Sequence, residues 1–306
     1  MTSQQLVQLF MDYLRVERQY AEDTQTAYLA DIKDFMAFLI STDEAKQVKL
    51  TSVDDLTVRV YLSALYDRGI SQKTIARKVS ALRSFYQFME ANQLVTHNPF
   101  NGIHLKKAGR HLPRFFYHEE LQALFKAAYE DQSVLGLRNQ VLLEFLYGTG
   151  ARVSEMAELI LAEVDQAARI VHITGKGDKT RIVPFGQFAA AALQQYLELS
   201  RPQLAKKQAQ PGLTLLLNQR GQAMTASGIE YVLKKLGEQA GLTQHISAHM
   251  FRHTFASDML NNGADLRTVQ QLLGHSSLST TQIYTHVTTD KLQQSYRQFF
   301  PRASER

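Results

Sequence analysis

Apolar residues recur at helical spacing through the first third of the chain, and no strand-like alternation interrupts them. Thr24 or Thr26 is a candidate cap for the second of four expected helices, and Ser71 for the fourth. The apolar positions of these helices are Leu6, Phe10 and Leu14; Tyr28, Ile32, Phe35 and Leu39; Leu56, Val60 and Leu65; and Ile75, Val79, Leu82, Phe85, Tyr86 and Met89. Residues 1–96 are therefore predicted to form a helical bundle.

Residues 97–116 differ in composition from the predicted bundle. They contain two prolines, two glycines, four lysines or arginines and no acidic residue, and without periodicity they are typical of a linker. A basic linker between two globular units can follow a nucleic-acid backbone, so Lys106, Lys107 and Arg110 are candidate DNA contacts. The alternative, a plain solvated tether, stays open.

Residues 117–306 mix helical and strand-like patterns. Two short runs, Arg169–Thr174 and Arg181–Phe185, flank a Gly-Lys-Gly-Asp turn and predict a hairpin. Leu213–Leu217 is a candidate further strand. The remaining patterns predict helices that open at His118, span Leu137–Tyr147 and Ala189–Leu199, start near Thr225, Ser247, Asp265 and Ser279, and close with Lys291–Phe300. The expected fold class is mainly α with a small β-hairpin or sheet, in two domains: an N-terminal helical bundle and a C-terminal mixed α/β domain.

Composition narrows the functional classes. A net charge of +5 and a pI near 9.2 suggest a polyanionic partner. The chain has no cysteine, which excludes disulfides, thiolate chemistry and cysteine-ligated zinc. The N-terminus lacks the layout of a signal peptide, and no apolar run approaches the ~18 residues of a membrane span. We expect a cytoplasmic protein without a membrane partner.

The fourth predicted helix carries Lys73 and Arg77, which are four residues apart and share a face. A phosphate-binding surface and a solvated helix surface both fit this pattern. The sequence does not distinguish between these two interpretations.

Short motifs in the second domain carry groups suited to an anionic phosphate. Arg152 follows a glycine-rich break, Gly148–Gly150, where backbone can approach a phosphate closely. Arg252 lies three residues after His249 on one face of a predicted helix. Guanidinium forks match phosphate oxygens better than an ammonium does. Lys176 stands at the tip of the predicted hairpin, and each of these residues taken alone also fits an ordinary surface position.

Two competing interpretations of these motifs fail, one on its spacing and the other on the identity of one residue. The Gly-Lys-Gly-Asp-Lys-Thr stretch lacks the Gly-x-x-x-x-Gly-Lys-Ser/Thr spacing of a nucleotide-binding loop. His249 and His253 are four apart, but Met250 stands where the helical zinc-protease motif has glutamate. No metal site is predicted.

In order and spacing, these motifs resemble those of the tyrosine recombinase (phage integrase) family, and the chain looks most like its Xer branch. The resemblance covers essentially all 306 residues. The matching stretches are Gly148–Glu155, Thr174–Arg181, His249–His253 and Leu273–Tyr284. Phe251 and Met156 replace leucines usual in the family, and Phe300 precedes Pro301 where Xer proteins often have histidine, which leaves the subfamily open.

The resemblance implies a role for each matching residue. These are Tyr284 as the nucleophile, Arg152 and Arg252 as a clamp on the scissile phosphate, Lys176 as the general acid for the leaving 5′ oxygen, His249 in acid–base chemistry, His275 in a hydrogen bond to the phosphate, and Glu155 as an accessory carboxylate that orients its neighbours.

The implied activity is site-specific DNA recombination through a 3′-phosphotyrosine, in Xer-like chromosome or plasmid dimer resolution. Bond energy is retained in the ester, and arginines supply the positive charge, so neither ATP nor another cofactor is expected. The expected partners are a double-stranded recombination site and a homo- or heterotetramer of protomers on two such sites. A related second recombinase and a DNA translocase remain open.

Three other functions stay under consideration: a topoisomerase-like relaxing enzyme, a DNA-binding regulator without activity, and a mobile-element integrase. The last helix also has two readings. In the family such a tail docks into a neighbouring protomer, whereas the apolar face with Leu292, Tyr296 and Phe299 equally allows it to fold back on its own domain.

Overall fold

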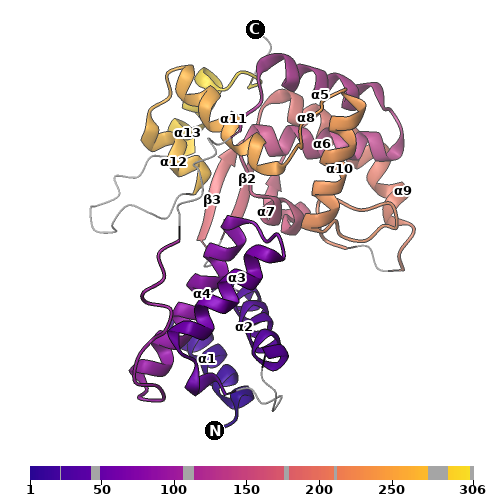
Figure 1. Ribbon diagram of the computed structural model, residues 1–306. Helices are drawn as coiled ribbons and strands as arrows, with labels where there is room; N and C mark the ends of the chain where they lie inside the picture. Colours follow the sequence, from indigo (N-terminus) through magenta and orange to yellow (C-terminus); the bar gives the residue numbers. More distant parts are fainter. Residues whose placement is uncertain are drawn as a thin grey trace. The chain divides into compact units, whose positions relative to one another are not determined.

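The computed structural model describes residues 1–20, 22–42, 49–105, 114–175, 179–209, 212–274 and 289–303. The chain forms two compact units, Met1–His111 and Leu112–Arg306 (Figure 1). The described part of the first unit is helical, and that of the second is mostly helical with one small sheet. The predicted fold class is confirmed.

The first unit is a helical bundle with an aromatic core. Its elements are α1 (Ser3–Val16), α2 (Glu22–Thr42), the short η1 (Leu50–Ser52), α3 (Asp55–Asp67) and α4 (Gln72–Ala91). Ser71 caps α4, because its hydroxyl accepts the Thr74 amide at 3.2 Å. The second helix begins at Glu22, before both candidate threonines, so its predicted cap is wrong.

The predicted inward face of α3 is right at Leu65 but wrong at Leu56 and Val60. Leu56 and Val60 are 67% and 47% exposed, whereas Val58, Tyr61 and Leu65 are buried. Both sets have helical spacing, so the pattern within the helix did not distinguish them. The Tyr61 ring decides the rotation, because it packs edge-on against Phe35 with centroids 4.8 Å apart and its hydroxyl donates to Asp34.

The second unit surrounds a short antiparallel sheet with helices. Its elements are α5 (His118–Glu130), α6 (Val134–Thr149), α7 (Val153–Glu158), η2 (Leu161–Glu163), β1 (Val164–Asp165), β2 (Ile170–Gly175), β3 (Lys179–Pro184), α8 (Gln187–Gln195), a π-helical turn η3 (Tyr196–Ser200), α9 (Arg201–Ala205), α10 (Ala226–Gln239), α11 (Ala248–Asn261), α12 (Leu266–Leu273) and α13 (Thr289–Phe299). In Figure 1 the β2–β3 pair runs beside α7 and α12.

The hairpin prediction is confirmed, with β2 antiparallel to β3 from Ile170 opposite Pro184 to Gly175 opposite Lys179. The two-residue strand β1, which pairs with β2, was not predicted. The run Leu213–Leu217 is not a strand but makes isolated bridges at Thr214 and Leu217. Side chains rather than a neighbouring strand bind part of the backbone here. The Leu215 carbonyl accepts hydrogen bonds from the Tyr196 hydroxyl and from Arg201.

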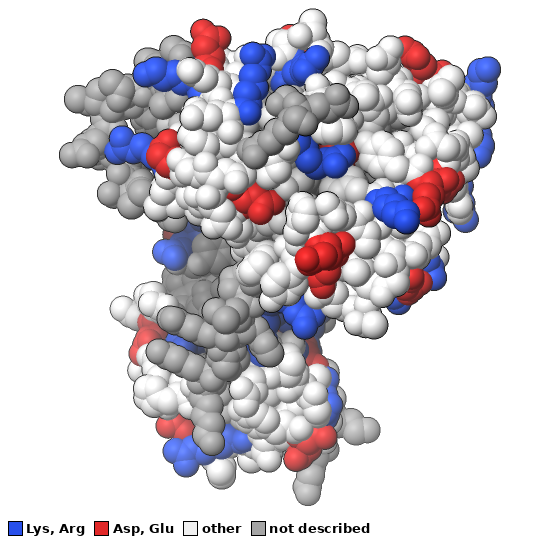
Figure 2. All heavy atoms as spheres, turned by 90° about the horizontal axis from the view of Figure 1, so that it is seen from above, with Lys and Arg blue, Asp and Glu red and all other residues white. Residues whose placement is uncertain are grey.

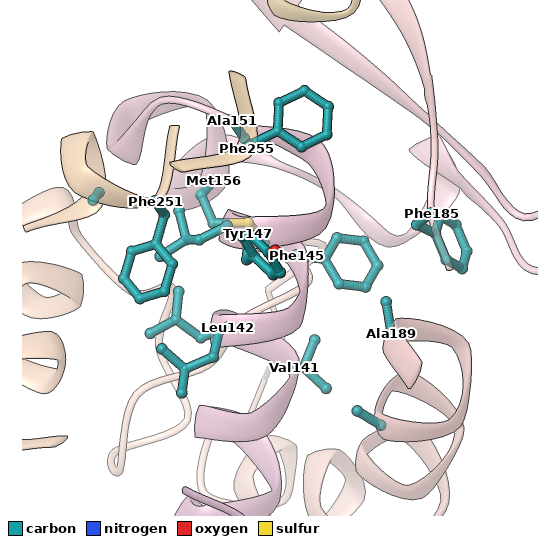
Figure 3. Packing of buried hydrophobic residues seen from close by; sticks show 14 of the residues in the cluster. Val141, Leu142, Phe145, Tyr147, Ala151, Met156, Phe185, Ala189, Phe251 and Phe255 are labelled. Atoms are coloured by element: carbon teal, nitrogen blue, oxygen red, sulfur yellow. The ribbon is translucent and has the colours of Figure 1, made fainter. Parts of the chain in front are cut away.

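Helix α6 lies at the centre of the second unit, and nearly all its residues from Gly136 to Thr149 are buried. Figure 3 shows Phe145 of α6 near Phe185 and Ala189, and Phe251 and Phe255 of α11 packed over the same helix. A helix that is buried on all sides forms part of a core. Because α6 is packed against its neighbours along most of its length, its C-terminal end is a rigid support for the residues that follow.

The last helix packs on its own unit. Tyr296 and Phe300 are buried, with ring centroids 4.8 Å apart. Arg302 forms an ion pair with buried Glu144, and its guanidinium lies 4.2 Å from the centroid of the Phe125 ring. Of the two readings of this tail, the structure shows the one in which it folds back.

Candidate active site

The first site residue, Arg152, is held at the break between α6 and α7. Gly150 ends α6 with φ +59°, a conformation that favours glycine. Arg152 then caps α7, and the Glu155 carboxylate accepts both its amide, at 2.8 Å, and its Nη1, at 2.6 Å. The Arg152 side chain remains 37% exposed while that of Glu155 is 4% exposed. Glu155 therefore orients a guanidinium that solvent can reach.

Arg252 reaches the same break from α11. Its Nη1 donates to the Gly150 carbonyl at 2.7 Å, and its Nη2 donates to the Leu273 carbonyl at the end of α12, at 2.6 Å. The residue is buried. The fold thus brings Arg252 together with Arg152 and Glu155, which belong to a different motif.

Arg181 of β3 is a third arginine in this cluster, and no role was predicted for it from the sequence. Its Nη1 and Nη2 donate to the two Glu155 oxygens at 3.0 and 2.8 Å, and its Nε donates to the Leu272 carbonyl at 2.8 Å. The only signal for it in the sequence was its place in the Gly-Lys-Gly-Asp-Lys-Thr-Arg motif. Because Glu155 and Arg181 are 26 residues apart, their ion pair produces no pattern in the local sequence.

The cluster holds three guanidiniums, from Arg152, Arg181 and Arg252, and one carboxylate, Glu155, so it carries an excess of positive charge. Burial raises the pKa of Glu155, but hydrogen bonds from Arg181 and Arg152 outweigh burial and bring it to about 2. Burial, together with the charges of Arg152 and Arg181, lowers the pKa of Arg252 to about 10. Glu155 and Arg252 are therefore both charged at neutral pH, and the cluster is suited to an anionic ligand.

The two histidines of α11 lie within a turn of Arg252 and are exposed. The rings of His249 and His253 have centroids 6.3 Å apart. Burial and the neighbouring His249 and Arg252 lower the pKa of His253. Among the described residues, no three histidine, aspartate or glutamate side chains converge as metal ligands would.

Lys176, His275 and Tyr284 lie outside the described residues. The residues just before the first two, Gly175 and Gly274, are described and border the arginine cluster. A Cβ built on Gly175 would lie 3.2 Å from Oε1 of Glu155, and one on Gly274 would lie 2.9 Å from Cδ of Arg181.

The candidate DNA contacts of the first unit differ in exposure and in whether their charge is already paired within the protein. Lys73 is exposed. Arg77 is 44% exposed in its side chain, but its Nη1 is paired with the buried Asp31 of α2. Lys106, Lys107 and Arg110 lie outside the described residues.

One face of the second unit shows no concentration of positive charge (Figure 2). On the face of the second unit seen in Figure 2, basic and acidic side chains are interspersed rather than gathered by sign. No helix in the described ranges has the length and apolar character needed to cross a bilayer.

Family comparisons match both units. Residues 7–93 match the phage integrase N-terminal SAM-like domain, and residues 114–291 match the phage integrase family. A protein of Pediococcus pentosaceus named tyrosine recombinase XerC is 50% identical over 301 residues, which cover 98% of this chain and 99% of the relative. The protein of the same name from Listeria innocua is 48% identical and covers 98% of each chain.

Solved structures share the fold. The XerH site-specific recombinase bound to a palindromic difH substrate aligns with a TM-score of 0.68 at 24% identity, over 89% of this chain and 79% of that one. A lambda integrase dimer bound to a COC′ core site aligns with a TM-score of 0.65 at 17% identity, over 100% and 99%. Together with the family matches and the near-full-length relatives, these findings show that the chain belongs to the phage integrase family, as a Xer-type tyrosine recombinase.

Proposed function

We propose that this chain cuts and rejoins DNA at a specific site through Tyr284, and that the scissile phosphate binds at the cluster of Arg152, Arg181, Arg252 and Glu155, in contact with Arg152 and Arg252. The observation that carries the proposal is the uncompensated charge of this cluster at the break after α6. Arg152 presents a partly exposed guanidinium there, held from behind by Glu155. A phosphodiester is an anion whose transition state spreads further negative charge over its oxygens, and preorganised guanidiniums stabilise that charge.

Arg152 and Arg252 would clamp the phosphate from two sides. A guanidinium has five N–H groups, and the described structure accounts for two of those on Arg252, at Gly150 and Leu273. Those two bonds fix the plane of the group and leave other donors for a ligand. A fixed guanidinium needs little reorganisation when the charge develops.

In the proposed step the Tyr284 oxygen forms a bond to phosphorus and the bond from phosphorus to the 5′ oxygen breaks. A free tyrosine has a pKa of ~10, so its proton must leave during attack. His249 acts in this acid–base chemistry, and Lys176 donates a proton to the leaving 5′ oxygen. His275 hydrogen-bonds the phosphate. Attack by a 5′ hydroxyl on the 3′-phosphotyrosine reverses the step and rejoins a strand.

The partners and setting are proposed in the same way. Residues 1–96 would bind the core of the site, with Lys73 and Arg77 as contacts, and residues 97–116 would link them along the backbone to a catalytic domain at 117–306. Exchange between two duplexes needs four active sites, hence four protomers, alike or of two kinds. Relatives named tyrosine recombinase XerC, and a neighbour solved on its DNA substrate, support a DNA recombination site as the partner. The proposed setting is chromosome or plasmid dimer resolution in the cytoplasm.

Covalent trapping tests the proposal. The protein is incubated with nicked genomic fragments from its host, adducts are isolated under denaturing conditions, and the attached ends are sequenced. We expect one short recurring sequence joined through its 3′ phosphate, and no adduct from Tyr284→Phe at equal DNA binding. An adduct that persists in Tyr284→Phe, or attachment spread over unrelated sequences, would contradict site-specific cleavage by this tyrosine.

A further inference from the structure

We propose that Arg181 is a positioning residue for the reaction, and that its side chain holds in register the chain segments that lead to Arg152, Lys176 and His275. This inference rests on the proposed function. It concerns an arginine that touches no reacting atom in the proposed step. Its evidence is the set of contacts that one largely buried side chain makes with separate parts of the site.

The first contact is with Arg152, through Glu155. Arg181 donates to both carboxylate oxygens, and the same two oxygens accept the amide and Nη1 of Arg152. The Arg181 and Glu155 side chains are only 10% and 4% exposed. Without Arg181, the carboxylate would keep its bonds to Arg152 but would lose the guanidinium that donates to both of its oxygens.

The second contact is with the chain just before Lys176. Gly175, the last residue of β2, lies so close that a Cβ there would come within 3.2 Å of Glu155 Oε1 and 3.7 Å of Arg181 Nη1. A Cβ at 3.2 Å is tighter than an ordinary contact, so a side chain here would require the Glu155 carboxylate to shift by a few tenths of an ångström. The Glu155–Arg181 pair therefore sets the position from which the chain continues into Lys176.

The third contact is with the chain just before His275. Arg181 Nε donates to the Leu272 carbonyl at 2.8 Å, and a Cβ on Gly274 would lie 2.9 Å from Arg181 Cδ. Gly274 has φ +65° and ends α12. Arg181 thus holds the Leu272 carbonyl, and Arg252 holds the Leu273 carbonyl. These are the last two carbonyls of α12.

Lysine cannot reproduce this arrangement. The rigid guanidinium fork grips both carboxylate oxygens and still directs Nε to a carbonyl on another element, whereas an ammonium is a point charge with one nitrogen. We therefore expect Arg181→Lys to lie between wild type and Arg181→Gln in every measurement of cleavage.

The test uses full-length protein and a nicked duplex that carries the site captured by the wild type. Single-turnover cleavage by Arg181→Gln should be slower by about 10²-fold, the size expected for a misplacement of ~1 Å, with DNA affinity within about threefold of wild type. A second substrate has sulfur in place of the 5′ leaving oxygen. Because a thiolate leaves without protonation, the ratio of sulfur to oxygen rates should rise in Arg181→Gln if Lys176 is mispositioned.

Arg201→Gln is the matched control. Arg201 also donates to backbone carbonyls in the same unit, at Gly212 and Thr214, but it contacts no residue of the cluster in the described structure. It should lower thermal stability and leave the cleavage rate and the sulfur-to-oxygen ratio of the folded protein unchanged. Gly175→Ala, which crowds Glu155 Oε1 at 3.2 Å and makes only an ordinary contact with Arg181 Nη1 at 3.7 Å, should raise that ratio as Arg181→Gln does.

Wild-type cleavage by Arg181→Gln would overturn the proposal, and so would slower cleavage with an unchanged sulfur-to-oxygen ratio. Either result is distinct from failure of the proposed function, in which the wild-type protein itself would form no adduct that depends on Tyr284.

Discussion

The Glu155 carboxylate should stabilise the catalytic unit by an amount that depends on pH in a defined way. Its pKa in the folded protein is about 2, against an ordinary value of 4.5. At about 1.4 kcal/mol for each pH unit, this difference corresponds to about 3 kcal/mol. Because the side chain is only 4% exposed, solvent screens the interaction little. Glu155→Gln keeps the shape of the side chain and removes this contribution.

The sign follows from the lowered pKa. A carboxylate with a depressed folded-state pKa contributes its full stabilisation above its unfolded pKa and loses it as the pH falls toward the folded pKa. Glu155→Gln should therefore be less stable than wild type by about 3 kcal/mol at pH 7. The difference should shrink to about half of that near pH 3, where much of the wild-type carboxylate is protonated in the unfolded state but not in the folded state.

Urea titrations in which unfolding is followed by hydrogen–deuterium pulse labelling measure the free energy of unfolding and test this prediction. Peptides from α6 report on the catalytic unit alone, which matters because a chain of two units need not unfold in one step. Glu158→Gln is the control, since Glu158 is an exposed carboxylate on the same helix, and it should change stability by less than about 0.5 kcal/mol. Equal stability of Glu155→Gln and wild type at pH 7, or a deficit that stays constant down to pH 3, would refute the reasoning.

Two further predictions concern other parts of the chain. Lys176→Ala should slow cleavage strongly on an ordinary duplex and recover on the 5′-sulfur substrate, because a thiolate needs no general acid; equal slowing on both would mean that Lys176 only positions DNA. Arg302→Gln should destabilise the catalytic unit by about 3 kcal/mol at neutral pH in urea titrations, because it leaves the buried Glu144 carboxylate without its charged partner. Burial already raises the pKa of Glu144, so this deficit should narrow as the pH falls and the carboxyl takes up a proton. The double variant Glu144→Gln/Arg302→Gln should recover most of the loss, and a double variant no more stable than Arg302→Gln would contradict this account.

The packing of the tail changes how a truncation can be interpreted. Deleting residues 290–306 would remove Tyr296, Phe300 and Ala303, all of which are buried in the second unit. Loss of cooperativity after that deletion would therefore mix a damaged core with any loss of contact between protomers. The Arg302 variants perturb the tail while leaving these core residues in place.

Much of this protein is determined by its sequence over short distances. Ser71 caps α4 and the stripe from Ile75 to Met89 faces inward, because capping and helical spacing act within a few residues. The β2–β3 hairpin follows in the same way from two short runs and the turn between them. The family also could be recognised from motifs whose order along the chain is itself sequence information.

Other features were decided only when distant segments met. The rotation of α3 depends on Phe35 of another helix, and the last helix folds back because Glu144 and the aromatic rings around it accept the tail. The role of Arg181 is the clearest case, since neither its charge nor its place in the hairpin indicates a bond to Glu155. Periodicity specifies which side of an element is apolar, but which charges pair and which faces are buried depends on neighbours that only the tertiary fold supplies.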